Sequence, residues 1–203
     1  MRTIIDLRND DEIRPHAGQQ LTRLTGSAQF TAPVRTASPP FWMNRVEVAI
    51  DDIADAGFWQ FLNRERLNGT PLYFRPFLDR KPERCAAAVT ALASASPGGV
   101  IFHCGAGRDR TGLVALVLLA LADVEPGAIA ADYEMSAEPV KALFTAMGLP
   151  DQGPGIEAAL TERGTTASAA VLAALDSFNA ETYLLAAGAS PADLAAIRCR
   201  LLG

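Results

Sequence analysis

The sequence predicts an α/β domain of three layers, with helices on both faces of a mostly parallel sheet and a largely helical C-terminal part. Two patterns support this prediction. Short apolar runs typical of buried strands are followed by helical segments, and one such run, 99–102, leads through a glycine-containing loop into a nearly all-apolar helix. A strand, a loop and a helix in this order form a right-handed crossover unit, which binds ligands at the carboxyl end of the strand.

Length and composition are those of a globular protein. The chain has 203 residues, of which 49% are hydrophobic and 20% charged, so we expect residues 1–203 to form one domain with a substantial core. The net charge of −5 gives no indication of a nucleic-acid partner. The longest apolar run, 113–122, is too short to cross a bilayer, so stable membrane insertion is not expected.

Two strands are predicted before the 99–102 run. Residues 2–7 have an apolar centre and predict a buried strand, and Val46, Val48 and Ile50 alternate with other residues in a second one. The intervening residues 15–40 hold few large apolar side chains and several Gly, Thr, Ser and Pro, which indicates a long surface connection. Residues 71–78 fit either a short strand or a helical turn. Helices are expected through 58–62, over 83–95, over 111–122, through 129–135, over 167–175 and over 192–202.

The loop after the 99–102 run carries the candidate chemistry. Five residues, several of them small, separate Cys104 from Arg110. Glycine and alanine allow the backbone to curl so that successive N–H groups point inward, and the N-terminus of the following helix adds its positive end. The sequence therefore predicts a nest for a dianion such as a phosphate group, with a thiol inside it.

Each polar residue of this loop has an expected role. Inward N–H groups, the helix N-terminus and a guanidinium favour the thiolate of Cys104, the nucleophile. Arg110 offers a planar fork that binds two phosphoryl oxygens and stays charged. A hydrogen bond from Thr111 to the sulfur would make the thiolate a better leaving group in the second step. His103 is expected to orient the loop rather than to transfer protons.

Two carboxyl groups are candidates for the general acid. Asp109 lies inside the loop, where the negative charge of a bound phosphate favours its protonated form. Asp79 lies in a stretch before the helix that precedes the 99–102 run, where a mobile acid loop is possible. The alternatives are an ion pair of Asp109 with Arg108 or Arg110, and a helix-capping or solvated position for Asp79. For Cys104 the alternative is a buried structural cysteine.

At this point the chain resembles a known family. Residues 103–112 read His-Cys-Gly-Ala-Gly-Arg-Asp-Arg-Thr-Gly, which is similar to the signature of the atypical bacterial protein-tyrosine and lipid phosphatases of the PtpB type, within the cysteine-dependent phosphatase superfamily. Further matches are Asp6-Leu7-Arg8 followed by Glu12, Asp132-Tyr133-Glu134-Met135-Ser136, and Ile197-Arg198-Cys199-Arg200-Leu201-Leu202. From the residues alone, Arg8 and Glu12 are expected to pair across a turn.

The resemblance implies a protein-tyrosine-phosphatase-like fold and hydrolysis of phosphomonoesters without a metal or another cofactor. It favours Asp109 over Asp79 as the acid, and implies a helical lid over the active site at residues 138–165, where the residues alone fit a packed helical hairpin equally well. The predicted site comprises Cys104, Arg110 and Asp109 as catalytic residues, Gly105, Ala106, Gly107, Arg108 and Thr111 as substrate-binding residues, and His103 and Gly112 as supporting residues.

The chain departs from the family pattern in two places. Arg108 replaces the usual lysine, which changes reach and donor geometry, so a lysine-dependent preference for a second phosphate or an inositol ring does not carry over. The family also has a further strand before its Asp-Leu-Arg strand, whereas here Met1 stands almost directly before it. Either the start is truncated or the edge of the sheet is built differently.

The expected function is hydrolysis of phosphotyrosine through a cysteinyl-phosphate intermediate. The substrate would be a phosphorylated protein or a lipid headgroup: a deep pocket above Cys104 favours phosphotyrosine, and a wide pocket with Arg108 exposed favours phosphoinositides or dual specificity. A phosphate-binding module without turnover is the alternative from another class. A sulfurtransferase fits Asp109-Arg110-Thr111 less well, and an arsenate reductase would require further cysteines near Cys104.

The cysteines indicate a reducing compartment. Cys85, Cys104 and Cys199 are odd in number and irregularly spaced, so neither a disulfide framework nor a zinc site is predicted, although oxidation of Cys104 and its pairing with Cys85 stay open. The N-terminus lacks the pattern of a signal peptide. We therefore expect a cytoplasmic location, with leaderless secretion as the alternative.

Overall fold

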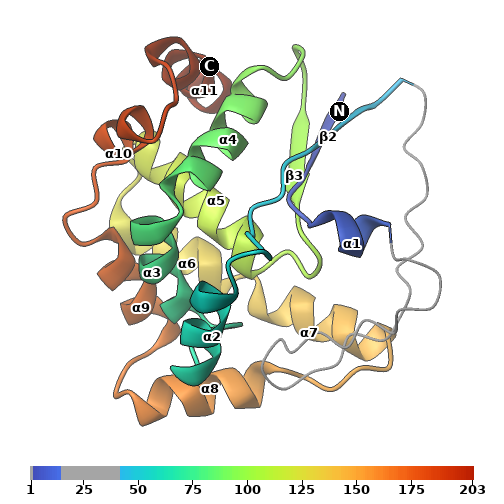
Figure 1. The fold of residues 1–203 in the computed structure, drawn as a ribbon, viewed down its shortest axis with the longest axis vertical. Helices are drawn as coiled ribbons and strands as arrows, with labels where there is room; N and C mark the ends of the chain where they lie inside the picture. The colour runs from blue at the N-terminus through green and yellow to red at the C-terminus, as the bar shows by residue number, and fades with distance from the viewer. Residues whose placement is uncertain (1, 15–41) are drawn as a thin grey trace.

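A computed structural model describes residues 2–14 and 42–203 of the chain. Its sheet contains the parallel strands β1 (Thr3–Asp6), β2 (Asn44–Glu47) and β3 (Val100–His103), in the order β2-β1-β3 (Figure 1). The predicted α/β class and parallel sheet are confirmed. The surface connection predicted over 15–40 lies outside the described residues.

The second strand begins and ends earlier than the alternation over 46–50 predicts. β2 ends at Glu47, yet the Val48 N–H still donates to the Asp6 carbonyl at 2.8 Å and the Ile50 N–H to the Leu7 carbonyl at 3.3 Å. The backbone therefore stays beside β1 while it leaves regular strand geometry. Side chains continue to alternate after the regular strand ends, so the sequence pattern predicts the end of β2 too late.

The predicted helices are present, and residues 71–78 are helical rather than extended. The 3₁₀ turn η1 (Pro71–Tyr73) leads directly into α3 (Phe74–Arg80), and Thr70 caps the turn by accepting from the Leu72 N–H. The short helix α10 was not predicted from the sequence. The remaining helices are α1 (Asp10–Ile13), α2 (Ala56–Arg64), α4 (Pro82–Ala93), α5 (Asp109–Leu121), α6 (Pro126–Glu134), α7 (Ala137–Ala146), α8 (Gly153–Glu162), α9 (Ala167–Leu175), α10 (Ala180–Ala186) and α11 (Pro191–Leu202).

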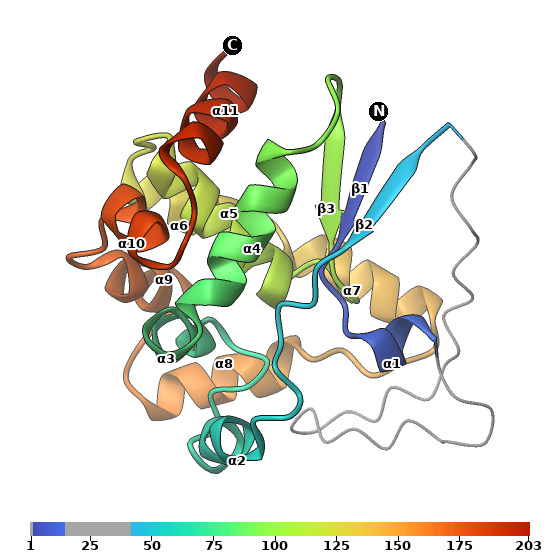
Figure 2. The same ribbon diagram turned by 45° about the horizontal axis from the view of Figure 1, so that its top comes forward.

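Two neighbouring rows of paired residues near the carboxyl end of the sheet differ in polarity. Ile5 pairs with Val46 and Phe102, and these three side chains belong to or pack against the main core, which α4 and α5 complete (Figure 2). The next row along the strands, Asp6 with Glu47 and His103, points the opposite way because side chains alternate in a strand. Parallel strands bring their carboxyl ends to one edge, so this polar row lies beside the loop that begins at Cys104.

The nearly all-apolar helix α5 is buried, as its composition predicts. Six of its side chains are buried: Leu113, Val114, Leu116, Val117, Leu118 and Leu121. At its first turn, a Cβ added to Gly112 would lie 2.9 Å from a ring carbon of Tyr133 on α6, which is too close for a carbon contact. Gly112 thus permits the close approach of α5 and α6 that fixes the start of α5.

Helices α7 and α8 bury their apolar side chains apart from the main core. Their buried apolar side chains are Val140, Phe144, Ala159 and Leu160, and none of these belongs to the main core cluster of the described residues. In the ranges that the structure describes, no helix is long and apolar enough to span a membrane.

Candidate active site

The loop after β3 surrounds the sulfur of Cys104 with donors. The Thr111 hydroxyl donates to Sγ at 3.2 Å and the Gly107 N–H lies 3.3 Å from it, while the Cys104 N–H donates to the Thr111 oxygen at 3.0 Å. Gly107 has φ of +81°, a conformation that favours glycine and turns its N–H inward. Cys104 is only 7% exposed, and its sulfur faces two hydrogen-bond donors of its own loop.

Arg110 stands beside this loop with its guanidinium already oriented. Its Nη1 and Nη2 donate to the two carboxylate oxygens of Glu12 at 2.6 and 2.8 Å, and Asp51 lies 3.4 Å from Nη1. Because Nη1 and Nη2 each give one N–H to Glu12, the Nε–H and the second N–H of Nη2 lie on another edge of the guanidinium. Two N–H groups in this arrangement can bind two phosphoryl oxygens. Burial alone would lower the pKa of Arg110, but Glu12 and Asp51 outweigh it and raise the pKa.

Glu12 and Asp51 are site residues that the sequence analysis missed. Of the expected pair of Arg8 with Glu12, the structure retains a charge interaction, while the Arg8 guanidinium hydrogen-bonds Asp6 and the Glu12 carboxylate hydrogen-bonds Arg110. The spacing of four residues indicated a local pair. A contact between residues 98 positions apart leaves no trace in a single sequence.

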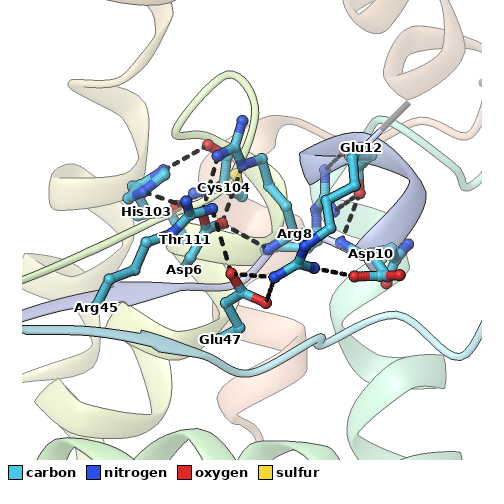
Figure 3. Close-up of polar contacts among 12 residues, drawn as sticks. Asp6, Arg8, Asp10, Glu12, Arg45, Glu47, His103, Cys104 and Thr111 are labelled. Atoms are coloured by element: carbon cyan, nitrogen blue, oxygen red, sulfur yellow. Dashed lines mark hydrogen bonds and ion pairs between the residues drawn. The ribbon is translucent and has the colours of Figure 1, made fainter. Parts of the chain in front are cut away.

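Asp6 anchors a buried charge cluster next to the loop (Figure 3). Arg8 donates from Nε and Nη2 to the two carboxylate oxygens at 2.9 and 2.8 Å, and Arg45 of β2 binds the same carboxylate. Burial acts to raise the pKa of Asp6, but hydrogen bonds from Arg8 and the positive charge of Arg8 and His103 outweigh it and lower the pKa to about 2. Asp6 is therefore ionised at any physiological pH.

His103 connects this cluster to the nucleophile. Its Nδ1 lies 2.9 Å from the Cys104 carbonyl oxygen and its Nε2 lies 3.7 Å from Asp6 Oδ2. The described contacts of the ring are to the Cys104 carbonyl and to Asp6, and neither is to the sulfur. The orienting role of His103 stays a prediction.

Asp109 and Arg108 form a bidentate ion pair at the start of α5. Arg108 Nε lies 3.0 Å from Oδ1 and Nη2 lies 3.1 Å from Oδ2 of Asp109. The ion pair considered for Asp109 is thus present with Arg108, and it orients the carboxyl group inside the loop. Arg108 itself is buried, so it does not offer an exposed charge to a substrate.

Asp79 lies in a different setting. It is on α3, its side chain is 55% exposed, and it pairs with Arg75 one helical turn away at 3.1 Å. This is the solvated position considered for it, because its carboxylate binds Arg75 on the exposed surface of α3. Of the other predicted residues, Gly105 lies against the guanidinium, where an added Cβ would be 3.7 Å from Arg110 Nη2, and Ala106 is a half-buried loop residue.

At the carboxyl end of a parallel strand, the Cys104 sulfur thus accepts hydrogen bonds from Gly107 and Thr111, and the Arg110 fork lies on the helix that follows the same loop. The model of the tyrosine phosphatase family matches residues 1–203, and the chain belongs to that family. A protein of Nostoc commune named "Tyrosine-protein phosphatase" is 48% identical over 46 residues, which are 23% of this chain and 16% of that protein.

Proposed function

We propose that this protein hydrolyses phosphotyrosine through a cysteinyl-phosphate intermediate. The observation that carries the proposal is a thiol that accepts from two donors of its loop, together with an arginine held by Glu12 with its Nη2 near Gly105 of the same loop. Within the family, the His-Cys-Gly-Ala-Gly-Arg-Asp-Arg-Thr-Gly loop favours the atypical bacterial PtpB type. Residues 1–203 would act as one catalytic domain with 138–165 as its lid, because α7 and α8 bury their apolar side chains outside the main core.

The reaction has two steps. Cys104 Sγ attacks phosphorus, the bond to the tyrosyl oxygen breaks, and Asp109 supplies the proton that this oxygen takes up. Arg110 and the loop N–H groups stabilise the charge on the phosphoryl oxygens. In the second step Asp109 takes a proton from water, whose oxygen attacks phosphorus, and the sulfur leaves as a thiolate that Thr111 stabilises.

The state of Arg108 supports a substrate with a single phosphate group. An exposed Arg108 would favour phosphoinositides, whereas this side chain is only 9% exposed and binds Asp109. The phosphoinositide or dual-specificity alternative would require Arg108 to leave that pair. The non-catalytic module is disfavoured because the nucleophile, the arginine and the threonine are all present and connected.

A substrate panel tests the proposal. Purified protein in chelator should hydrolyse phosphotyrosine peptides with kcat/KM at least about 10²-fold above that for matched phosphoserine peptides, because a buried sulfur is reached by a long aromatic ester more easily than by a short one. Steady-state kinetics on both peptides and on a phosphoinositide measure this ratio. A preference for the phosphoinositide, or binding of phosphotyrosine without turnover, would reject the assignment.

Glu12 should matter because it holds the Arg110 fork. In Glu12→Gln one of the two carboxylate oxygens becomes an amide that cannot accept from the guanidinium, so we expect kcat/KM to fall about 10–100-fold, the effect of losing one hydrogen bond to a charged group. Glu181→Gln is the matched control, because Glu181 of α10 forms an exposed pair with Arg198 of α11. Equal rates for Glu12→Gln and Glu181→Gln would show that Arg110 is oriented without Glu12.

A further inference from the structure

Arg108 serves as a bridge between three parts of the chain. Besides its pair with Asp109, its Nη2 donates to the Gly69 carbonyl at 3.0 Å and to Gln152 Oε1 at 3.2 Å. Gly69 has φ of +77°, a conformation that favours glycine, and it precedes the η1 turn. The guanidinium thus joins Asp109, the turn before η1 and the residue that caps α8.

Gln152 comes from a segment whose buried side chains pack outside the main core. It is the N-cap of α8, and the buried side chains of α7 and α8 lie outside the main core cluster of the described residues. The far end of α8 is attached by exposed contacts, an Arg66–Glu162 pair and a hydrogen bond from Arg163 to the Glu65 carbonyl. Its near end is attached to the phosphate loop by the part-buried bond of Gln152 to Arg108.

These contacts connect the carboxyl group of Asp109 to α8 through Arg108. Arg108 holds both oxygens of Asp109, so the direction of the Asp109 carboxyl follows the direction of the guanidinium. The guanidinium in turn is held by two neutral oxygens, one from Gly69 and one from Gln152. A general acid must point at the leaving oxygen within hydrogen-bond reach, so a small rotation of Arg108 would misdirect it.

We propose that Gln152 is a positioning residue for the general acid: through Arg108 it aligns Asp109, and it thereby couples the seating of α8 to proton donation. This inference rests on the proposed function, with Asp109 as the acid. Proton donation matters only for a leaving group that needs the proton. The dependence of the rate on the leaving group therefore separates positioning from a general structural role.

The test compares Gln152→Ala with wild type on two substrates. The measured quantity is kcat/KM, which reports the first step and not the later hydrolysis of the cysteinyl-phosphate. On phosphotyrosine, whose phenolate leaves poorly, we expect kcat/KM to fall about tenfold, because one hydrogen bond to a charged group is lost. On an activated aryl phosphate that leaves without a proton, kcat/KM should stay within about twofold. A merely structural role would reduce both rates by the same factor.

Two further variants act as controls. Gln152→Glu keeps an oxygen acceptor at the same position and should restore the wild-type ratio of the two rates. Glu157→Gln changes an exposed side chain of α8 that the argument does not use and should leave both rates unchanged. In an Asp109→Asn background, Gln152→Ala should have no additional effect, because the two residues act on one step.

The results separate a failure of the Gln152 role from a failure of the proposed function. Suppose that Asp109→Asn slows only the substrate with the poor leaving group. The role of Gln152 alone is then overturned if Gln152→Ala slows both substrates equally or slows neither. It is also overturned if the losses of Gln152→Ala and Asp109→Asn are additive. If Asp109→Asn shows no such selectivity, the acid assignment in the proposed function is wrong and the inference falls with it.

Discussion

Cys104→Ser should lower the rate of phosphotyrosine hydrolysis by at least about 10⁴-fold, the scale seen when a catalytic nucleophile is removed. A serine hydroxyl is not ionised at neutral pH, and the donors at 3.2 and 3.3 Å from the sulfur can stabilise an anion only if one forms. The fork of Arg110 and the loop N–H groups remain, so phosphate binding should survive. Single-turnover kinetics and equilibrium binding of a phosphotyrosine peptide measure the two effects separately.

The control for this variant is Cys199→Ser, because Cys199 is an exposed cysteine on α11. It should retain the wild-type rate. Turnover that persists in Cys104→Ser would contradict the cysteinyl-phosphate mechanism. Loss of binding together with turnover would instead indicate that the serine side chain has disrupted the loop.

The parts of the fold that depend on local chemistry were predictable from the sequence. Ser190 followed by Pro191 predicts the start of α11, and the Ser190 hydroxyl does accept from the Asp193 N–H at 3.1 Å. Small residues between Cys104 and Arg110 predict the curled loop, and the N–H of Gly107 faces the sulfur. In each case the residues that determine the geometry are neighbours in the chain.

The supporting contacts of the site were not predictable, because they join distant segments. Glu12 reaches Arg110 across 98 residues and Gln152 reaches Arg108 across 44. The nearness of Arg8 and Glu12 in the sequence predicts a pair across the turn. In the structure the Arg8 guanidinium makes two hydrogen bonds to Asp6, two residues away in the chain, while Glu12 binds the distant Arg110. Which partner Glu12 takes depends on the position of Arg110, which the residues around Glu12 do not encode.

Asp109→Asn should reduce kcat/KM for phosphotyrosine, which reports the first step, by about 10²–10⁴-fold, the usual contribution of a general acid, while Asp79→Asn should change it by less than about twofold. Asparagine keeps the shape of the side chain and one oxygen for Arg108, so the loop is retained and only the proton is lost. Asp79 pairs with Arg75 on the exposed side of α3, and its substitution affects a solvated pair that contributes little.

The dependence on the leaving group makes this comparison decisive. The defect of Asp109→Asn should shrink toward wild type as the leaving phenol becomes more acidic, because such phenolates depart without a proton. A series of aryl phosphates with leaving groups of graded acidity measures this slope in each variant. If Asp79→Asn steepens the slope and Asp109→Asn does not, α3 rather than the loop supplies the acid, and the bidentate pair of Asp109 with Arg108 serves only to hold the start of α5.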